Sequence, residues 1–370
     1  IRIVKLMRKI SFLFFLSSFV FFQTSSVTFS APISCRSLNA GKIDRSMKLT
    51  SDYYIVPNDN TASDCFTFYA DGITLDLNGH TISSSLLSGR GINLNNHKNI
   101  VIKNGIIQGF EFGIDGRFSS NIIPRNITVQ NITFKNNVKG IEFNGLNGAN
   151  ITKSTFSYDP SLRCISYPNC KPLVGISLVN SRNVILKTSL FQNLNDTGIK
   201  MNGSYGISVS GSIFKGQNQF GLSGVSSYNI LLLQNTFDGR DASGNIYTQY
   251  DGVYIDCSDS NSTPLGPVSI KNSTANFFRR DGFHITNCYT TSSASLISGN
   301  LAMSNQGNGF TDFQSFGAVY MNNTSSKNSI NGFFFSGTKN GIVQNNQANG
   351  NLLNGFVAID PSKKSYNISQ

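Results

Sequence analysis

The chain has 370 residues, of which 39% are hydrophobic and only 13% are charged, with 34 Gly and no Trp. Its many Gly, Asn and Ser residues favour a repetitive, stacked fold over one globular core, and no window has the period of an amphipathic α-helix. The formal net charge is +11. Because no dense run of Lys and Arg with interleaved aromatic residues is present, we expect no nucleic-acid partner.

Residues 1–30 are typical of a secretory signal peptide. Arg8 and Lys9 follow Met7, an apolar run covers residues 10–22, and small residues come next. An uncleaved anchor is the alternative, but the apolar run is short for a membrane span. No second hydrophobic segment follows. We therefore expect a secreted or periplasmic protein without a membrane span after signal cleavage.

A glycine followed by an apolar residue, one further residue and a second apolar residue recurs along the chain, as in GINL, GISL and GFFF. These glycines are Gly91, Gly113, Gly140, Gly175, Gly198, Gly221, Gly252, Gly282, Gly309, Gly332 and Gly355. Half of their intervals are 22 or 23 residues, which predicts a basic coil of that length. The longest intervals, of 35, 31 and 30 residues, predict inserted loops after Gly140, Gly221 and Gly252.

Each coil contains three short strands with alternating apolar positions, separated by turns rich in Asn, Gly and Ser. Such strands pair with the coils above and below. The sequence therefore predicts an all-β fold, a right-handed single-stranded parallel β-helix of about 11 to 12 coils with three short sheets. A two-sheet sandwich is the competing fold, but it lacks a fixed coil length. Residues 31–70 are expected to form an N-terminal cap and lead-in, residues 71–360 the β-helix, and residues 361–370 a C-terminal tail.

Two further rows accompany the glycines. The residue after each glycine changes from aliphatic, as in Ile92, to aromatic from Phe283 onward, which predicts an inward stack. The residue before the later glycines is acidic or Asn, which predicts a ladder of mutually hydrogen-bonded side chains: Asp251, Asp281, Asn308, Asn331 and Asn354. We interpret this ladder as structural.

The six cysteines of an exported chain predict disulfides. Fifteen connectivities are conceivable, and the spacing favours one of them. Two cysteines flank a short loop, two precede the repeats, and two follow the glycines of consecutive repeats by five and six residues. The favoured pairs are Cys164 with Cys170, Cys35 with Cys65, and Cys257 with Cys288.

The segment from residue 35 to 83 contains FTFYADGITLDLNGHTI after Cys65. It resembles the opening coil of secreted proteins in the pectin-lyase-like right-handed β-helix superfamily, and the resemblance covers about residues 35–360. That superfamily includes pectate and alginate lyases, polygalacturonases, mannuronan epimerases and copper-insertion accessory proteins. The resemblance implies a polysaccharide partner and a carbohydrate groove lined by the strands that carry the glycine motif.

The motifs of individual members are missing. Polygalacturonases carry NTD, DD, GHG and RIK segments, whereas this chain has only NDT at 195–197. The YGFDPH-like segment of mannuronan epimerases has no match in YDGVYID (250–256) or RRDGFHITN (279–287). A lyase needs fewer fixed motifs, because its chemistry requires only a base and a cation or donor beside a uronate carboxylate.

Positions two and four residues after the repeat glycines are expected to point outward and to share one face. Near the middle, this face combines a cation, a phenol, a carboxylate and an imidazole, and we expect these four residues to be catalytic: Lys200, Tyr254, Asp256 and His284. We expect a second set to bind substrate: Asp115, Arg117, Glu142 and Asn202.

Two functions stay open. One is a lyase or epimerase acting on an acidic polysaccharide; the other is a non-catalytic surface or adhesive protein that binds carbohydrate. Convergence of the four catalytic candidates in a cleft would favour the enzyme. We expect a monomer without a cofactor, since the only Ca²⁺ candidates, Asp251, Asp256 and Asp281, do not match the spacing of a known calcium loop.

Overall fold

A computed structural model describes residues 33–38, 41–55, 64–85, 87–117, 126–159, 173–359 and 367–369. All of them belong to one compact unit, Pro32–Gln370, which is separate from residues 1–31. The predicted signal peptide and the Cys164–Cys170 pair therefore lie outside the described residues. Within the described residues, no helix combines the length and apolar character that a membrane span needs.

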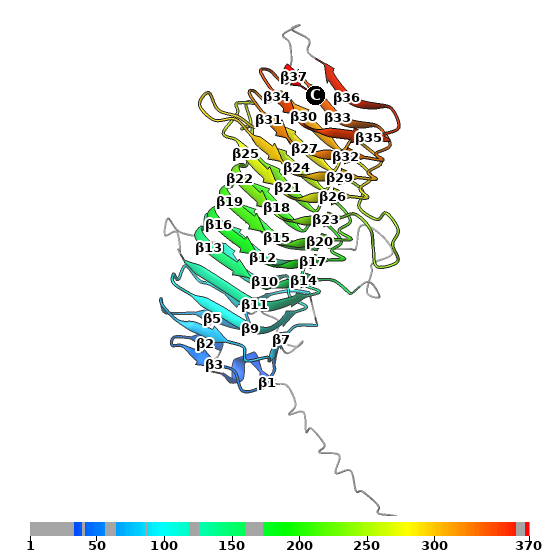
Figure 1. Cartoon of the computed structure of the whole chain (residues 1–370). Coiled ribbons are helices and arrows are strands. Elements are labelled where there is room, and N and C mark those ends of the chain that lie inside the picture. The colour runs from blue at the N-terminus through cyan, green and yellow to red at the C-terminus, as the bar shows by residue number, and fades with distance from the viewer. Residues whose placement is uncertain are drawn as a thin grey trace, which may run out of the picture. The chain divides into compact units, whose positions relative to one another are not determined.

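Thirteen parallel strands, one from each coil, form the first sheet (Figure 1). They are β2 (Lys42–Ile43), β5 (Phe66–Phe68), β8 (Arg90–Asn93), β10 (Phe112–Arg117), β12 (Lys139–Asn144), β15 (Val174–Val179), β18 (Ile199–Asn202), β21 (Leu222–Val225), β24 (Val253–Asp256), β27 (Phe283–Thr286), β30 (Phe310–Phe313), β33 (Asn331–Ser336) and β36 (Asn354–Ile359). Eleven of these strands, β8 to β36, contain the glycine motif.

The remaining strands form a 24-stranded sheet made of two ladders, which are joined where the long strands β9 (Val101–Gln108) and β11 (Ile127–Lys135) belong to both. The first ladder also contains β3 (Met47–Lys48), β6 (Thr74–Asp76), β13 (Asn147–Thr152), β16 (Arg182–Lys187), β19 (Tyr205–Ser210), β22 (Tyr228–Leu233), β25 (Val268–Lys271), β28 (Leu296–Ser298), β31 (Val319–Met321), β34 (Ile342–Gln344) and β37 (Asn367–Ser369). The second also contains β1 (Ile33–Ser34), β4 (Tyr53–Tyr54), β7 (Thr81–Ser83), β14 (Thr155–Ser157), β17 (Leu190–Gln192), β20 (Ile213–Lys215), β23 (Thr236–Asp238), β26 (Thr274–Asn276), β29 (Leu301–Met303), β32 (Thr324–Ser326) and β35 (Gln347–Asn349).

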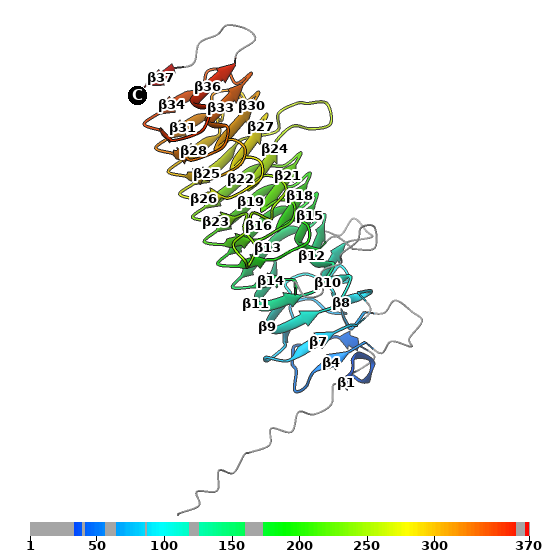
Figure 2. The same ribbon diagram turned by 90° about the vertical axis from the view of Figure 1, so that its right-hand side faces the viewer.

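The prediction of an all-β parallel β-helix of about a dozen coils is confirmed, and Figure 2 shows the coils stacked from β1 to β37. One 3₁₀ turn, Cys35–Ser37, is the only helix among the described residues. The pairing begins earlier than expected, because β1 pairs with β4 and β2 pairs with β5. The described part of residues 31–70 therefore already forms coils, and β37, in the expected tail, pairs with β34.

The bend between the two ladders is one place where Asn recurs. Asn131, Thr188 and Asn272 occupy this corner in three coils, with φ of 53°, 49° and 50°. Asn tolerates this left-handed conformation better than most residues because its short polar side chain can bond locally. The Asn131 side-chain amide donates to the Asn104 side-chain oxygen in the preceding coil, at 3.1 Å. The same residue type thus forms the turn and links adjacent turns.

The repeat glycines are required by close approach between coils. A Cβ added to Gly198 would lie 2.5 Å from the carbonyl oxygen of Gly221 and 2.6 Å from the ring of Phe214. The same conflict with the next glycine's carbonyl recurs from Gly91 to Gly332. These glycines therefore make room for the neighbouring strand and for a stack of phenylalanines, without needing a positive φ.

Stacked side chains fill the interior as predicted. Phe134, Phe156, Phe191, Phe214 and Phe237 stack with ring centroids 4.5–4.7 Å apart. The residues after the repeat glycines are buried from Ile92 to Phe333, and only the last of them, Phe356, is partly exposed, at 37%. The core is thus one continuous column, each coil covering the next.

Two of the three predicted disulfides are confirmed. Cys35 bonds to Cys65 and Cys257 bonds to Cys288, with Cα atoms 5.0 and 4.8 Å apart. The second disulfide links the ends of β24 and β27, which are neighbours in the 13-stranded sheet. It therefore ties together the two strands that carry Tyr254 and His284.

Candidate functional site

The outer face of the 13-stranded sheet has the register that the sequence predicts. The residues two positions after the repeat glycines are direct partners on consecutive strands: Asn93, Asp115, Glu142, Ser177, Lys200, Ser223, Tyr254, His284, Thr311 and Phe334. Several polar members of this row are buried, with Asp115 1%, Glu142 5% and His284 8% exposed. Burial of charged groups requires partners, so the contacts of each group decide its role.

Near the N-terminal end, the acidic residues of this row are paired with arginine and lysine. Arg117 donates twice to the Asp115 carboxylate, at 3.0 and 2.8 Å, and Arg90 donates to it at 3.3 Å. Arg90 also pairs with Asp64, and Lys139 lies 2.8 Å from Glu142. We call these six residues the N-terminal charged cluster.

The pKa of Asp115 reflects this pairing. Burial opposes its ionisation, but the hydrogen bonds and charge of Arg117, together with the charge of Arg90, outweigh burial and lower the pKa of Asp115. Asp115, Arg117 and Glu142, expected to bind substrate, are therefore engaged with other side chains of the chain. The fourth residue of that set, Asn202, is exposed on β18, two strands beyond β12.

The four expected catalytic residues do not converge. Ser223 lies between Lys200 and Tyr254 in the register, which places these two residues about 10 Å apart along the sheet. The Lys200 side chain is 57% exposed, and its nearest acidic partner is Asp196 at 3.9 Å. Asp256 accepts hydrogen bonds from the amide and hydroxyl of Ser258 at 3.0 and 2.7 Å, so it holds the turn after β24.

Tyr254 and His284 do meet, and two further acidic residues join them. The Tyr254 and His284 rings are in edge-to-face contact with centroids 5.1 Å apart. His284 Nδ1 lies 3.6 Å from Asp251 Oδ2 and 3.7 Å from Asp281 Oδ2. We call Asp251, Tyr254, Asp281 and His284 the central cluster.

The electrostatics of the central cluster are opposite to those of the N-terminal charged cluster. Burial and the nearby charge of Asp251 raise the pKa of Asp281, against hydrogen bonds from Thr311 and Asn308 that lower it. Burial, followed by the charges of Asp256 and Asp251, raises the pKa of Tyr254. Negative charge in this cluster is thus poorly compensated.

Aromatic rings extend from the central cluster in both directions. Successive ring centroids lie 4.9 to 5.9 Å apart in a row of six residues: Tyr250, Phe220, Tyr254, His284, Phe313 and Phe334. The guanidinium of Arg280 lies 5.7 Å from the Tyr250 ring centroid. We call these six residues the aromatic row; it presents ring faces and edges beside a cation.

Inserted loops flank the central cluster, as the glycine intervals predict. Residues 239–250 precede β24 and contain a bridge between Arg240 and Ile246, and residues 257–267 follow it and contain a bridge between Ser258 and Pro264. The insertion expected after Gly140 includes residues 160–172, which lie outside the described residues. Loops therefore leave the sheet at both ends of the strand that carries Tyr254.

The sequence analysis assigned Asp251 and Asp281 to a structural ladder, and that ladder exists. The amide of Asp281 donates to Asp251 at 2.8 Å, the amide of Asn308 donates to Asp281 at 2.7 Å, and the pattern continues to Asn354. The second oxygen of each carboxylate faces His284, and spacing alone does not reveal this. The signal available in the sequence is an acidic residue directly before the glycine in YDGVYID and RRDGFHITN, which also contains Arg280.

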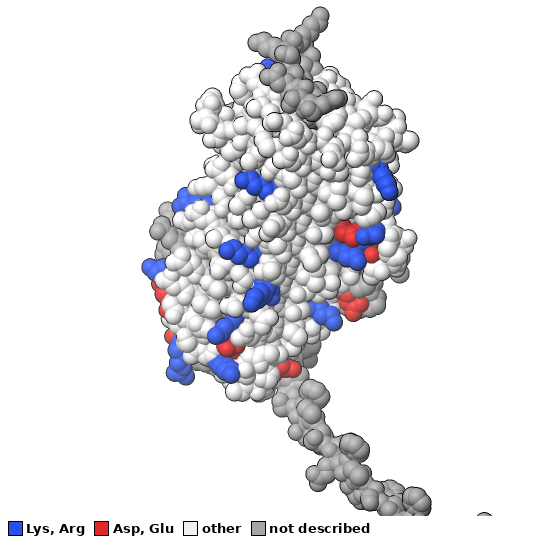
Figure 3. Space-filling view, viewed as in Figure 1, with Lys and Arg blue, Asp and Glu red and all other residues white. Residues whose placement is uncertain are grey.

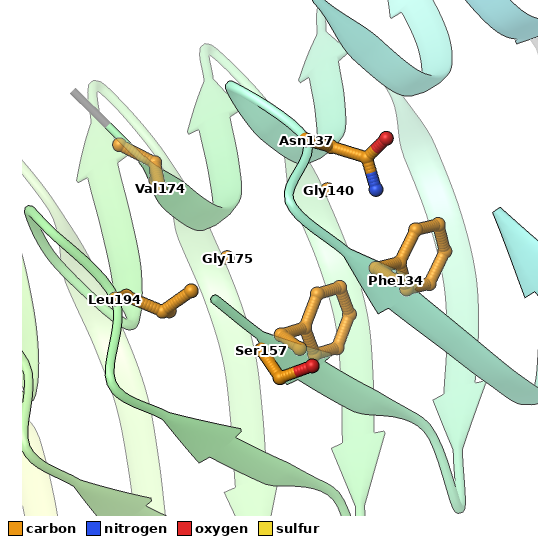
Figure 4. Close-up of a pocket in the computed structure, with 8 residues that line it drawn as sticks. Phe134, Asn137, Gly140, Ser157, Val174, Gly175 and Leu194 are labelled. Carbon is orange, nitrogen blue, oxygen red and sulfur yellow. The ribbon is translucent and has the colours of Figure 1, made fainter. Parts of the chain in front are cut away.

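Figure 4 shows a small pocket lined by Phe134, Asn137, Gly140, Phe156, Ser157, Val174, Gly175 and Leu194. Its volume of about 10 Å³ suffices for roughly one water molecule and excludes a sugar. On the face shown in Figure 3, Lys and Arg are scattered singly instead of forming a continuous basic patch. The candidate site is the outer face around Tyr254, because the central cluster and the aromatic row lie there.

No protein-family model matches the chain, and no curated protein is similar to it in sequence. Solved structures are similar in fold. The A-module of the mannuronan C-5 epimerase AlgE6 from Azotobacter vinelandii has a TM-score of 0.67 at 13% identity, covering 91% of this chain and 100% of that one. The A-module of AlgE4 from the same organism has a TM-score of 0.51 at 9% identity, covering 91% and 93%. This similarity establishes the parallel β-helix fold and transfers no catalytic residues.

Proposed function

We propose that the protein binds an acidic polysaccharide along the aromatic row and acts on it at Tyr254 as a uronate lyase or epimerase. The observation that carries this proposal is the row itself, with a phenol and an imidazole at its centre and Arg280 beside it. Aromatic side chains offer flat apolar surfaces to sugar rings. The two structural neighbours named above are mannuronan C-5 epimerases, which supports the proposal at the level of the fold.

Both reactions start by removing the proton from the carbon next to a uronate carboxylate. A cation must neutralise the carboxylate, and a proton-transfer group must reach the sugar. In a lyase, the electron pair left behind forms a carbon–carbon double bond and expels the glycosidic oxygen; in an epimerase, a proton returns from the opposite face. We assign the carboxylate contact to Arg280 and proton transfer to Tyr254, which is partly exposed, whereas its neighbour His284 on the next strand is buried.

This assignment replaces Lys200 by Arg280. Arg280 is close enough for its charge to affect the pKa of Tyr254, which it lowers against the larger effect of burial. Asp256 is near Tyr254, but its carboxylate accepts a hydrogen bond from the Ser258 hydroxyl. The two disulfides favour an oxidising compartment and so accord with a secreted or periplasmic protein.

The second candidate is a non-catalytic protein that binds carbohydrate on the same face. The separation of Lys200 from Tyr254 favours it, because the four side chains expected to form a catalytic site do not converge. An aromatic row binds sugar without any proton transfer. The two functions therefore share a surface and differ in the role of Tyr254.

Turnover of defined polyuronates separates these functions. The purified chain is incubated with alginate and pectate, ultraviolet absorbance detects unsaturated ends, and proton NMR detects epimerised residues. We expect Tyr254→Phe to reduce turnover by about 10²-fold or more, and Arg280→Ala to weaken it. The exposed Lys215→Ala on β20 is the control, expected to match the wild type.

Binding on a glycan array completes the test. Binding without turnover by the wild type would contradict the enzyme and support the second candidate. No binding to any polysaccharide would contradict both. A Tyr254→Phe variant as active as the wild type would remove Tyr254 from the reaction.

A further inference from the structure

Three side chains of the central cluster bring one potential ligand atom each close together. Asp251, Asp281 and His284 each supply a nitrogen or carboxylate oxygen, and these atoms all lie within 4.8 Å of one another. They come from the ladder position of two coils and from β27, which the parallel register brings side by side. The side chains are 1%, 13% and 10% exposed, respectively. Two enclosed carboxylates at this separation repel each other unless one of them is protonated or a cation lies between them.

The distances within this group do not fit hydrogen bonds. His284 Nδ1 is 3.6 and 3.7 Å from the two carboxylate oxygens, longer than an N–H···O hydrogen bond of about 2.7 to 3.2 Å. Accordingly, neither His284 Nδ1 nor Asp251 Oδ2 has a hydrogen-bond partner, although both atoms are buried. Two ligands bound to one metal at about 2.0 to 2.2 Å in tetrahedral geometry lie about 3.4 Å apart. The observed separations are closer to that value.

The other polar atoms of the same side chains are already held. Asp251 Oδ1 accepts from the amide of Asp281 at 2.8 Å, and Asp281 Oδ1 accepts from the amide of Asn308 at 2.7 Å. The Thr311 hydroxyl donates at 2.6 Å to Asp281 Oδ2, the oxygen that faces His284. His284 Nε2 lies 3.4 Å from the hydroxyl of Thr286. Residues that fix the far side of each ligand are characteristic of metal sites, because they orient the atoms that bind the ion.

The other two histidines of the chain show the contrast. His80 Nδ1 lies 3.1 Å from Asp52, and His97 Nδ1 lies 2.9 Å from Asp71, each with a single carboxylate at hydrogen-bond distance. Both pairs are more exposed than the central cluster. His97 is therefore a matched control, because its Nδ1 has a hydrogen-bond partner in the neighbouring aspartate.

We propose that Asp251, Asp281 and His284 bind one divalent transition-metal ion of the Zn²⁺ type between β24 and β27. An imidazole nitrogen with two carboxylates suits Zn²⁺ or Mn²⁺ better than Ca²⁺, which prefers oxygen ligands alone. A divalent ion would also balance the two carboxylate charges while the imidazole stays neutral. Three protein ligands leave a coordination position open. Metal binding rests on this geometry alone, whereas any contact of the ion with a uronate carboxylate rests on the function proposed above.

Metal binding is measured on tag-free full chain that has been stripped with a chelator and dialysed against Zn²⁺, Mn²⁺ or Ca²⁺, followed by elemental analysis and calorimetry. We expect one equivalent of Zn²⁺ in the wild type and in His97→Ala. His284→Ala should weaken binding by at least about tenfold. Asp251→Asn, which keeps a side-chain oxygen to accept from the Asp281 amide, should weaken Zn²⁺ binding by a similar factor. It serves as a second test if His284→Ala fails to fold.

The imidazole NMR signals locate the ion, because the chain has only 3 histidines. Addition of Zn²⁺ should shift the His284 signals and leave those of His80 and His97 unchanged. Equal Zn²⁺ affinity in the wild type and both cluster variants, or no bound Zn²⁺ in the wild type, would overturn the proposal.

Turnover after chelation separates this proposal from the proposed function. Bound Zn²⁺ that depends on His284 in a protein inactive on every polyuronate would support the metal site and contradict the enzyme. Polyuronate turnover by a wild-type chain that binds no metal at any tested concentration would overturn the metal site and leave the enzyme standing.

Discussion

The N-terminal charged cluster and the central cluster occupy the same sheet and the same rows, yet their charges are arranged differently. Asp115 and His284 both stand two residues after a repeat glycine. Asp115 has two arginines within 3.3 Å, whereas in the described part of the chain no Lys or Arg lies within 4.0 Å of Asp251 or Asp281. Equivalent positions of the repeat therefore carry a charge-balanced ion-pair network near the N-terminal end and, among the residues that the structure describes, a pair of carboxylates without a cationic side chain near the middle.

The difference shows that equivalent positions of a repetitive fold can hold either a stabilising ion pair or a functional group. A buried charge with its own partners stabilises the coil that holds it, and its pKa moves toward the charged form, as for Asp115. A buried charge without a cationic partner is unfavourable, and its pKa moves toward the neutral form, as for Asp281.

The disulfides carry the largest expected effect. Replacing Cys257 and Cys288 by Ser should lower the free energy of unfolding by about 3 to 4 kcal/mol, since the bond closes a loop between residues 31 apart. The same change at Cys35 and Cys65, 30 residues apart, should cost a similar amount. Urea unfolding measures both. Only the first change should reduce polyuronate turnover, and equal losses of turnover would contradict a separate role for the central region.

A buried acid beneath the central region should make stability depend on pH. Asp312 is 0% exposed, its pKa is raised to about 6 by burial, and the Tyr320 hydroxyl donates to it at 3.2 Å. A raised pKa means that the contribution is complete below the unfolded pKa of about 4 and is lost as pH rises through about 6. Asp312→Asn should therefore raise the free energy of unfolding by up to about 3 kcal/mol at pH 8 and have no such effect at pH 4. Equal effects at both pH values in urea unfolding would contradict this.

The N-terminal charged cluster should have the opposite pH dependence. Arg117→Ala removes two charge-assisted hydrogen bonds from buried Asp115 and should cost about 2 kcal/mol at pH 7. Because the pKa of Asp115 is lowered, this stabilisation is present above the unfolded pKa and is lost as pH falls through the folded value. Arg240→Ala, which breaks a similar pairing with the less buried Asp238, is the control and should cost less than about 1 kcal/mol. Similar losses in the two variants would contradict the importance of burial.

Lys200 gives the smallest expected effect. Its side chain is mostly exposed and pairs only loosely with Asp196. Lys200→Ala should change the free energy of unfolding by less than about 0.5 kcal/mol and leave polyuronate turnover unchanged. Loss of turnover in this variant would restore the catalytic role expected from the sequence.

The fold was predictable because the same short sequence motif recurs from coil to coil and has the same structural reason each time. Each repeat glycine from Gly91 to Gly332 lies where a Cβ would strike the next coil, so the glycine interval reports the coil length directly. The register also followed, and it correctly placed Tyr254 beside His284. The same register places Ser223 between Lys200 and Tyr254 and so separates the two side chains.

The rest of the site depends on side-chain direction. Asp251 and Asp281 each use one carboxylate oxygen in the ladder, and the other oxygen faces His284. A sequence pattern does not show which oxygen of a carboxylate makes which contact. Arg280 and Tyr250 meet because an inserted loop turns back against the neighbouring coil. Loop length is visible in the sequence, but the path of the loop is not.

The same substitution made in both clusters tests the contrast most directly. Asp115→Asn and Asp251→Asn are compared for urea unfolding of the metal-free protein and for polyuronate turnover. We predict that Asp115→Asn loses about 2 kcal/mol of stability and keeps its turnover, whereas Asp251→Asn, which removes one of two repelling carboxylates, loses no stability and loses turnover. An Asp251→Asn variant that is destabilised as much as Asp115→Asn while remaining fully active would contradict the account.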